Sequence, residues 1–295
     1  MKSTDPRRLA AGATGWPDRF AHLEQPPPWI WLWGTEAPMH PAVAVVGSRR
    51  ATAIGLEIAR TLGRDLGEAG IQVISGMARG IDAAAQRGAL EDGGTTVAVL
   101  GCGVDVCYPP EEATLRDGIV ANGCLISEEE RGALPLPHQF PKRNRLIAAL
   151  AVAVVVVEAT LRSGALSTAR WAADLGREVL AVPGSIRSSR SDGTNRLIRD
   201  GARPFLGLDD LFDAVPELVG PAAGGTGARR RRRTVPRLSA ELEDLLGHLG
   251  PDPVHPDAVG AACGLSAAAV ASSLGALELA GAVMSLPGGL VARTF

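Results

Sequence analysis

The chain lacks the excess of basic residues that marks many proteins of nucleic acids. Its 295 residues include 30 basic and 32 acidic side chains, which gives a formal net charge of −2. Lysine is almost missing, because Lys2 and Lys142 are the only two and the other 28 basic residues are arginines. Any case for nucleic-acid binding must therefore come from local clusters and not from the whole chain.

Paired cysteines and long apolar runs are also missing. The four cysteines form no Cys-x-x-Cys pair and have no histidines at zinc-ligand spacing, so the sequence predicts reduced thiols and no metal. The first residues hold no apolar run of the signal-peptide kind, and the longest apolar stretch, roughly 146–157, is too short to cross a bilayer. These absences predict a soluble, cytoplasmic protein that has no membrane partner.

Short apolar runs rich in Val and Ile alternate with helical patterns from residue 42 to about 215. The clearest helix repeats Ile or Leu every four residues from Ile54 to Leu66, which places apolar side chains on one face. The runs predicted as buried strands are 42–47, 71–75, 95–101, 124–127, 152–157 and 178–182. The helices predicted between and after them are about 81–92, 111–122, 143–150, 165–176, 194–200 and 209–215. This alternation predicts an α/β fold, an extended Rossmann-like, doubly wound and mostly parallel sheet.

Composition divides the chain into four predicted parts. Residues 1–40, rich in Pro and Trp, are interpreted as a lead-in segment with a β-like run at 29–33, packed on the Rossmann-like domain at 41–216. A Gly- and Arg-rich stretch at 217–236 cannot form a packed core and is predicted to be a linker. Residues 237–295 predict a small C-terminal winged-helix domain. Its expected elements are helices at 239–249, 256–263 and 267–279 and a hairpin at 282–292.

Two strand-to-helix junctions combine glycine with arginine. One is Gly47-Ser48-Arg49-Arg50 and the other is 76–82, which ends in Asp82. Backbone N–H groups and the helix dipole at such junctions bind anions, and the carboxyl ends of parallel strands are where ligands lie in doubly wound sheets. We therefore expect the two junctions to lie side by side as an anion site. The alternative for the first is an ordinary turn, and Asp82 is expected to play a structural role.

A third stretch, 138–145, has three cations within four residues together with an aromatic ring. Lys142, Arg143 and Arg145 would contact phosphates, while Phe140 offers a face for base stacking, which is worth roughly 1–3 kcal/mol per base. Asn144 would read a base edge or hold the loop. The alternative is a solvated run of charges beside a core phenylalanine. Two further junctions, 161–168 and 181–198, offer small residues with room for a phosphate.

These stretches belong to a longer series of motifs, in order along the chain. The series is Gly47-Ser48-Arg49, Ser75-Gly76-x-Ala78-Arg79-Gly80-Ile81-Asp82, Gly101-x-Gly103-x-Asp105-x-x-Tyr108-Pro109, Ser127-Glu128, Phe140-Pro141-x-Arg143-Asn144-Arg145-x-Ile147, Val157-Glu158-Ala159, Ser163-Gly164, Pro183-Gly184 and Gly193-Thr194-Asn195-x-Leu197-Ile198-x-x-Gly201-Ala202. Over about 40–208 the series resembles the DNA-processing protein A family (DprA, also called Smf).

The resemblance implies a function, partners and site residues. Members of the family bind and protect single-stranded DNA during natural transformation, load the RecA recombinase onto it and act as homodimers. Because this role is one of binding, the resemblance implies no catalysis and no cofactor. The family motifs and the junctions together predict the DNA-binding residues Gly47, Ser48, Arg49, Arg79, Gly80, Phe140, Lys142, Arg143, Asn144, Arg145, Ser163 and Gly164. No short motif marks the dimer surface or the RecA contact.

The predicted C-terminal domain has the shape but not the charge of a DNA reader. The stretch 266–281, where a recognition helix would lie, contains no Arg, Lys, Asn or Gln. Two arginines against six acidic residues leave 237–295 with a charge of −4, which repels phosphates. We interpret the domain as a protein-interaction or self-association module. The arginine run at 229–233 either adds nonspecific DNA affinity or is a solvated tether.

Two other functions fit parts of the pattern. The sheet and its Gly-rich edges also resemble nucleotide phosphoribohydrolases, which carry a Pro-Gly-Gly-x-Gly-Thr block. Here that block is broken, because Pro183-Gly184-Ser185 is separated from Gly193-Thr194. The remaining alternative is a regulatory protein whose pocket holds a small nucleotide.

Overall fold

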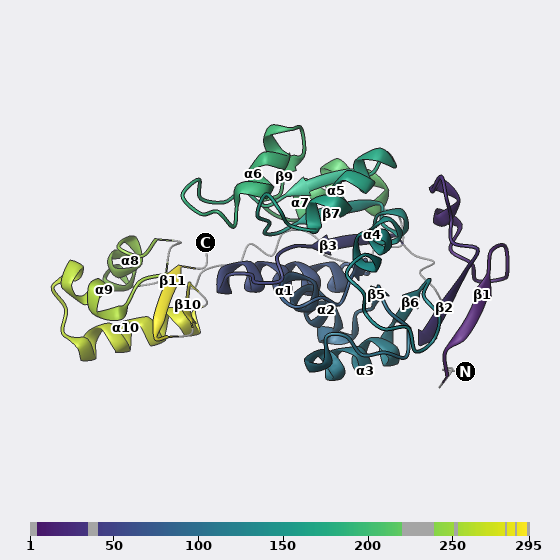
Figure 1. Cartoon of the computed structure of the whole chain (residues 1–295). Coiled ribbons are helices and arrows are strands. Elements are labelled where there is room, and N and C mark those ends of the chain that lie inside the picture. Colours follow the sequence, from purple (N-terminus) through teal and green to yellow (C-terminus); the bar gives the residue numbers. More distant parts are fainter. Residues whose placement is uncertain are drawn as a thin grey trace. The chain divides into compact units, whose positions relative to one another are not determined.

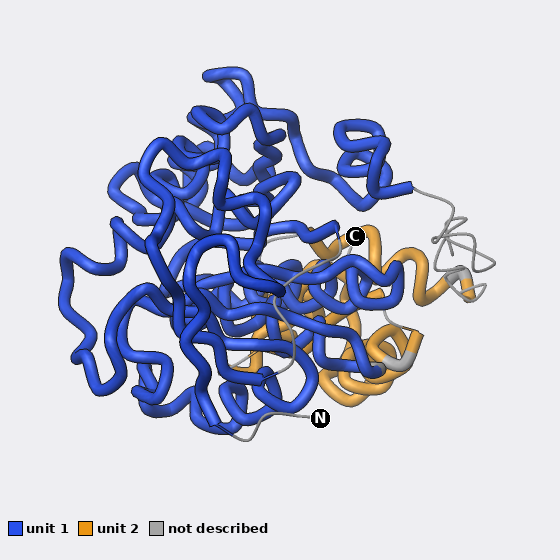
Figure 2. Tube along the Cα trace, turned by 90° about the vertical axis from the view of Figure 1, so that its right-hand side faces the viewer, with its two compact units in different colours: residues 1–226 blue, residues 227–295 orange. Residues whose placement is uncertain are grey.

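The structure is a computed structural model that describes residues 5–34, 41–219, 239–250, 253–280, 282–286 and 288–293. The chain forms two compact units, residues 1–226 and 227–295, which are coloured separately in Figure 2. The predicted linker at 217–236 lies outside the described residues from 220 onward, so its boundaries stay a proposal.

Unit 1 is built on one mixed sheet, to which the described residues contribute nine strands (Figure 1). The strands are β1 (Arg7–Ala10), β2 (Trp29–Gly34), β3 (Ala42–Val46), β4 (Gln72–Ser75), β5 (Thr96–Leu100), β6 (Cys124–Ser127), β7 (Ala153–Val156), β8 (Glu178–Ala181) and β9 (Arg203–Pro204). Their order is β1-β2-β6-β5-β4-β3-β7-β8-β9, with parallel pairing from β6 to β9. This arrangement confirms the Rossmann-like, mostly parallel sheet.

The N-terminal segment contributes to the sheet itself. The sequence predicts a β-like run at 29–33 that packs on the main domain, whereas the structure pairs β2 antiparallel with β6 and β1 antiparallel with β2. Alternate residues of β2 are buried, with Ile30 and Leu32 in the core and the three tryptophans half-buried. This period of two is what a strand with one buried face requires, so residues 7–34 extend the sheet by two strands.

Helices cover both faces of the sheet. They are α1 (Ala53–Glu68), α2 (Ile81–Leu90), α3 (Ala113–Asn122), α4 (Gln139–Leu150), α5 (Ala165–Asp174), α6 (Asp192–Arg199) and α7 (Leu208–Ala214), with 3-10 turns η1 (Asp18–His22), η2 (Glu91–Gly93), η3 (Pro110–Glu112) and η4 (Pro216–Val219). In strand β3, alternate side chains pack against the helices on opposite faces of the sheet. Val43 and Val45 pack with α1, α2 and α7, and Ala44 and Val46 pack with α4 and α5.

Helix α4 begins four residues earlier than the sequence predicts. Its first residue is Gln139 and not Arg143, so the basic cluster is the opening turn of the helix and not a loop before it. Pro141 fits this earlier start, because proline is tolerated in the first turn, where the N–H groups have no intrahelical partner. This shift decides which of the clustered side chains face the site.

Unit 2 consists of three helices and a hairpin. They are α8 (Ala240–Gly247), α9 (Pro256–Cys263), α10 (Ala267–Leu279) and the antiparallel pair β10 (Val283–Leu286) and β11 (Leu290–Arg293). Gly264 ends α9 with a φ of +67°, and the Ser266 hydroxyl accepts the Ala269 N–H at 3.3 Å to begin α10. The winged-helix prediction is confirmed. Among the described residues no single helix has the length and apolar composition to cross a membrane, although α9 and α10 reach both limits as a pair bent by 109°.

Candidate nucleic-acid interface

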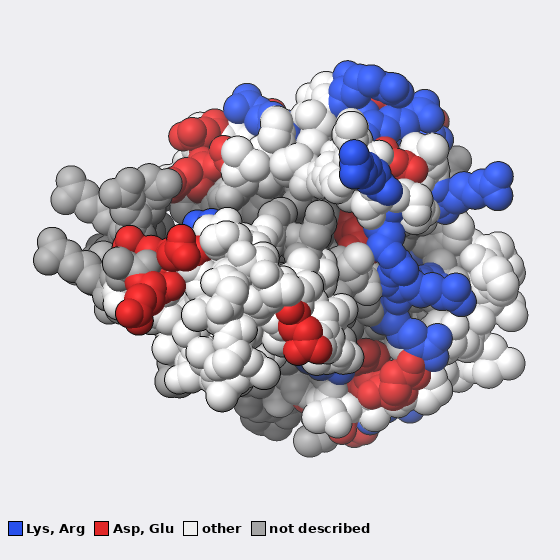
Figure 3. Space-filling model, turned by 90° about the vertical axis from the view of Figure 1, so that its left-hand side faces the viewer, with Lys and Arg blue, Asp and Glu red and all other residues white. Residues whose placement is uncertain are grey.

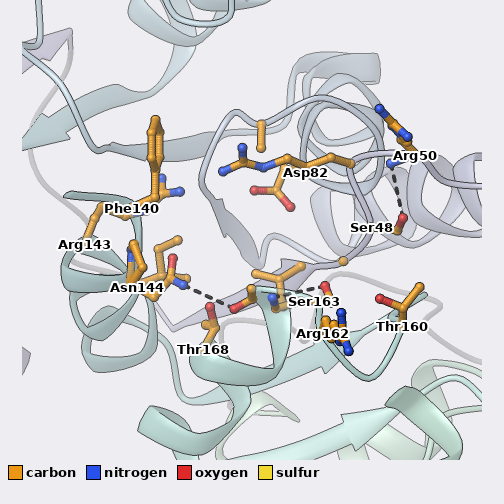
Figure 4. Close-up of a pocket in the computed structure, with 18 of the residues that line it drawn as sticks. Ser48, Arg50, Asp82, Phe140, Arg143, Asn144, Thr160, Arg162, Ser163 and Thr168 are labelled. Carbon is orange, nitrogen blue, oxygen red and sulfur yellow. Dashed lines mark hydrogen bonds between the residues drawn. The ribbon is translucent and has the colours of Figure 1, made fainter. Parts of the chain in front are cut away.

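A cavity of about 750 Å³ opens where β3 and β7 end (Figure 4). Its lining comes from the segments that follow these strands, from the start of α4, from the start of α5 and from the segment before α6. Ligands of doubly wound sheets bind at this carboxyl edge, next to the point where strand order reverses. The reversal lies here between β3 and β7, because the chain runs from β3 outward to β6 before it returns to β7.

The first two junctions meet beside this cavity, as the sequence predicts. The Ile81 N–H donates to the Ser48 carbonyl at 3.2 Å, and the Ser48 N–H donates to the Glu158 carbonyl at 2.7 Å. Gly80 has a φ of +80°, and a Cβ there would lie 2.2 Å from the Ser48 oxygen. Only glycine fits this approach, so Gly80 brings the two junctions together without lining the cavity itself.

Helix geometry divides the basic cluster of α4 into two faces. Phe140, Arg143, Asn144 and Ile147 all line the cavity. Their spacing of three and four residues places them on one side of the helix. Figure 4 shows the first three extending from α4 toward the same space.

The other face of α4 packs against glutamates. The Gln139 amide donates to Glu129 at 3.0 Å, and the Lys142 ammonium lies 3.5 Å from carboxylate oxygens of Glu128 and Glu129. Arg145 lies 2.5 Å from Glu128. Lys142 and Arg145, both predicted as DNA contacts, are therefore neutralised by acidic partners and do not line the cavity.

Arg143 lines the cavity wall but is committed to the protein interior. Its side chain is buried, with 4% of the residue exposed, and one guanidinium nitrogen donates to the carbonyls of Gly76 and Val99. Burial lowers its pKa to about 10, and the charge of Asp82 opposes that shift. A side chain that ties together the ends of β4 and β5 in this way positions the site, because the nitrogen that makes these bonds is held by two backbone carbonyls.

Asp82 has the structural role expected from the sequence. Its carboxylate accepts the Gly76 N–H at 3.1 Å, and burial raises its pKa while the nearby Arg143 lowers it. A Cβ on Gly76 would lie 2.4 Å from the Arg143 guanidinium, so glycine makes room for that buried cation. Asp82, Gly76 and Arg143 form a single buried polar group beneath the cavity.

Phe140 presents its ring among other flat groups. The Tyr108 ring centroid lies 5.6 Å away, and the Arg49 guanidinium carbon lies 5.0 Å from the Phe140 centroid. These three side chains also line a second, smaller cavity of about 30 Å³ together with Arg79. Arg79 is paired with Glu111, and this hydrogen bond raises its pKa.

The cavity wall is strongly basic. Five of its lining residues are arginines and one is acidic, and those six are Arg49, Arg50, Arg143, Arg162, Arg190 and Asp82. Arg49, Arg50 and Arg162 are exposed and form no ion pair with the described residues, whereas Arg190 lies 3.7 Å from the buried Glu158. Figure 3 shows Lys and Arg side chains gathered in a band on one face of the molecule.

Small polar groups complete the rim. The Ser48 hydroxyl accepts the Arg50 N–H at 3.2 Å, and the Asn144 amide donates to the Gly164 carbonyl at 3.3 Å, which ties α4 to the start of α5 (Figure 4). Asn144 thus connects two elements of the site, and its expected role of reading a base edge stays a prediction. Among the described residues no group of three or more His, Cys, Asp and Glu side chains is placed to hold a metal ion.

Eight of the twelve predicted residues line the larger cavity. They are Gly47, Ser48, Arg49, Phe140, Arg143, Asn144, Ser163 and Gly164. Arg79 lines the smaller one, and Gly80, Lys142 and Arg145 line neither. The prediction missed Arg50, Arg162 and Arg190. Arg50 and Arg162 are sequence neighbours of predicted residues and could have been found, whereas nothing local marks Arg190.

The fold and the site together define a Rossmann-like α/β protein with an arginine-lined cavity at the carboxyl edge of its sheet. A family model described as DNA recombination-mediator protein A matches residues 7–216, and a model described as DprA winged helix domain matches residues 229–289. The chain belongs to the DNA recombination-mediator protein A family, as its motifs predict.

Relatives with known structures share this architecture. A structure of DprA from Streptococcus pneumoniae aligns with a TM-score of 0.67 and 37% identity, covering 70% of this chain and 73% of that one. DprA from Helicobacter pylori, a structure that concerns the single-stranded DNA binding mode of that protein, aligns with a TM-score of 0.65 and 30% identity, covering 74% of this chain and 99% of that one. A putative DNA processing protein DprA of Mycobacterium tuberculosis is 42% identical over 81% of this chain, which spans 61% of that protein's length.

Proposed function

We propose that the protein binds single-stranded DNA in the arginine-lined cavity and acts as a recombination mediator. The observation that carries the proposal is the set of exposed arginines, without ion pairs to the described residues, beside an aromatic ring at the carboxyl edge of the sheet. Cations bind the phosphates of any nucleic acid, but a ring such as Phe140 can stack only on a base that is free of its partner strand. Together these groups favour an unpaired strand over a duplex.

Each group has a distinct part in this proposal. Arg49, Arg50 and Arg162 contact phosphates, because they are exposed and no acidic side chain in the described part of the chain forms an ion pair with them. The hydroxyls of Ser48 and Ser163 lie at strand-to-helix junctions, where the helix dipole also favours an anion. Arg143 and Asn144 are positioning residues, since their polar atoms bind the protein itself.

The family supports a wider proposal about the cellular role. A recombination mediator that protects incoming single-stranded DNA, loads RecA recombinase onto it during natural transformation and works as a homodimer needs a binding site but no catalytic group. We propose these roles for this chain, in the cytoplasm and without enzymatic activity. The support is the match of the family model over 7–216.

Replacement of Phe140 by alanine tests the stacking role. We expect affinity for oligo-dT to fall by about 1–3 kcal/mol, because one stacked base loses its platform. The slope of log K against log salt should stay unchanged, since no phosphate contact is removed. Salt-titrated fluorescence anisotropy measures both quantities. A change in slope without a change in affinity at low salt would assign Phe140 a different role.

Removal of residues 237–295 tests the interaction-module interpretation of unit 2. Helix α10 exposes small and acidic side chains and carries no cation, so the unit should contribute little to DNA binding. We expect the shortened protein to bind oligo-dT within about threefold of the full chain, a change below ~1 kcal/mol, because an acidic unit gains nothing from the phosphates. A loss of more than about tenfold would show that unit 2 holds DNA.

Competition separates this proposal from the small-nucleotide alternative. A strand that spans several arginines gains from each phosphate, whereas a mononucleotide engages one site at most. We expect thymidine monophosphate to displace oligo-dT only at far higher concentration. Displacement at comparable concentration would favour a pocket for small nucleotides, and release of a free base from nucleoside monophosphates would favour the phosphoribohydrolase alternative.

A further inference from the structure

The charges around the cavity are not distributed evenly. On the side of β4, β5 and β6, three cations have acidic partners: Arg79 pairs with Glu111, Lys142 with Glu128 and Glu129, and Arg131 with Asp105. On the side of β7 and β8, the exposed Arg162 has no ion pair within the described residues. A polyanion leaving the cavity is therefore attracted more strongly to the second side, where the charge of Arg162 is not offset by an ion pair within the described residues.

The loop between β8 and α6, residues 182–191, lies directly on that second side. Ser189 and Arg190 line the cavity, and Arg190 contacts Glu158 at the end of β7. The start of α6 packs against the segment that carries Arg162, because the Gly193 N–H donates to the Ala159 carbonyl at 2.7 Å. The loop thus continues the cavity wall beyond Arg162.

Both ends of this loop are held, while its middle projects outward. Gly184 and Asn195 exchange two hydrogen bonds, at 3.1 and 3.0 Å, and the Arg187 N–H donates to the Ser185 hydroxyl at 3.2 Å. Between these anchors Ile186 is 91% exposed, and Arg187 is exposed without an ion pair to the described residues. In a single strand each base face lies beside a phosphate. An apolar side chain that contacts the base and a neighbouring cation that contacts the phosphate match this arrangement.

We propose that the loop at 183–191 is a second contact surface for single-stranded DNA, along which the strand leaves the cavity past Arg162. Arg187 contacts a phosphate and Ile186 supports a base that lies outside the cavity. The proposal rests on the proposed DNA-binding function and adds to it the direction in which the strand runs. The glutamate-rich side, at 111 and 128–130, is left without DNA.

Oligonucleotide length distinguishes the loop from the cavity. The test compares oligo-dT of about 4 nucleotides, enough for the cavity, with oligo-dT of about 16, which extends beyond it. For the full chain with Ile186→Ala and Arg187→Ala, we expect about a tenfold loss for the long strand and no change for the short one. Both side chains are exposed, so the fold is not disturbed. Arg131→Ala is the matched control, because it removes an exposed arginine on the other side of the cavity.

Each outcome decides between the claims. Loss confined to the long strand, without loss in Arg131→Ala, supports the loop as the exit path. No loss for the long strand in the double variant, an equal loss for both strands, or a larger loss in Arg131→Ala, overturns the inference while the cavity keeps its proposed function. Failure of the unaltered protein to bind either strand overturns the proposed function, and the inference with it. Photo-crosslinking tests the exit path independently. A 4-thiothymidine placed at the end of the long strand should label residues 183–191 of the unaltered protein, and labelling at 128–131 would overturn the inference.

Discussion

Simultaneous replacement of Arg49 and Arg162 by alanine is expected to weaken oligo-dT binding by roughly 100-fold. Each arginine supplies a charge-assisted contact to a phosphate, worth about 1.5 kcal/mol or more. Each also releases counterions, so the slope of log K against log salt should become shallower by about 0.7 per residue. Anisotropy of a labelled oligo-dT at several salt concentrations measures affinity and slope in one series.

A charge-matched variant shows whether the loss of DNA affinity depends on the position of the arginine or on the net charge of the protein. Arg64 lies in the second half of α1, away from the strand ends that carry the cavity, and does not line it. Arg64→Ala removes one positive charge and should leave both affinity and slope nearly unchanged. If Arg49→Ala and Arg64→Ala had equal effects, binding would depend on overall charge and not on this cavity.

Arg143→Met is expected to destabilise unit 1 by about 3 kcal/mol or more. Methionine matches much of the side-chain volume but leaves the Gly76 and Val99 carbonyls without their donor and Asp82 without its nearby cation. Removal of one partner from a buried charged pair is costly because the remaining charge has no compensation. Urea unfolding, followed by circular dichroism, measures the loss.

The pH dependence of this loss has a definite sign. Burial raises the pKa of Asp82 in the folded state, so stability is lost as pH rises from the unfolded pKa through the folded one. Without Arg143 that penalty grows, and the difference between variant and parent should be largest at neutral pH and shrink in acid. Adding Asp82→Asn to Arg143→Met should recover part of the stability. A cost below about 1 kcal/mol would mean that Arg143 is not buried as an essential cation.

The sheet could be predicted because each strand carries its own signal. Runs such as 42–46 and 153–156 are apolar on both sides, which is what a parallel strand covered by helices requires. The pairing of β2 with β6 could not be predicted in the same way. It joins Trp31 to Ser127, and no local pattern records a partner so far along the chain.

The sequence brings most of the candidate residues to the cavity, and the start of α4 explains why Lys142 and Arg145 lie elsewhere. With α4 expected to start at Arg143, the cluster at 138–145 resembles one basic loop. With α4 starting at Gln139, the helical period sends Phe140, Arg143 and Asn144 to the cavity and the remaining cations to Glu128 and Glu129. Arg190 was missed for a different reason, since only the folded chain brings it to Glu158.

The central claim is that exposed arginines and an aromatic ring at the carboxyl edge of the sheet hold an unpaired strand. Salt-titrated binding of the unaltered protein to oligo-dT and to a duplex of equal length tests it most directly. The account predicts tighter binding to the single strand at every salt concentration, with an affinity that falls steeply as salt is added. Equal or tighter binding to the duplex, or binding to oligo-dT that salt does not weaken, would contradict it.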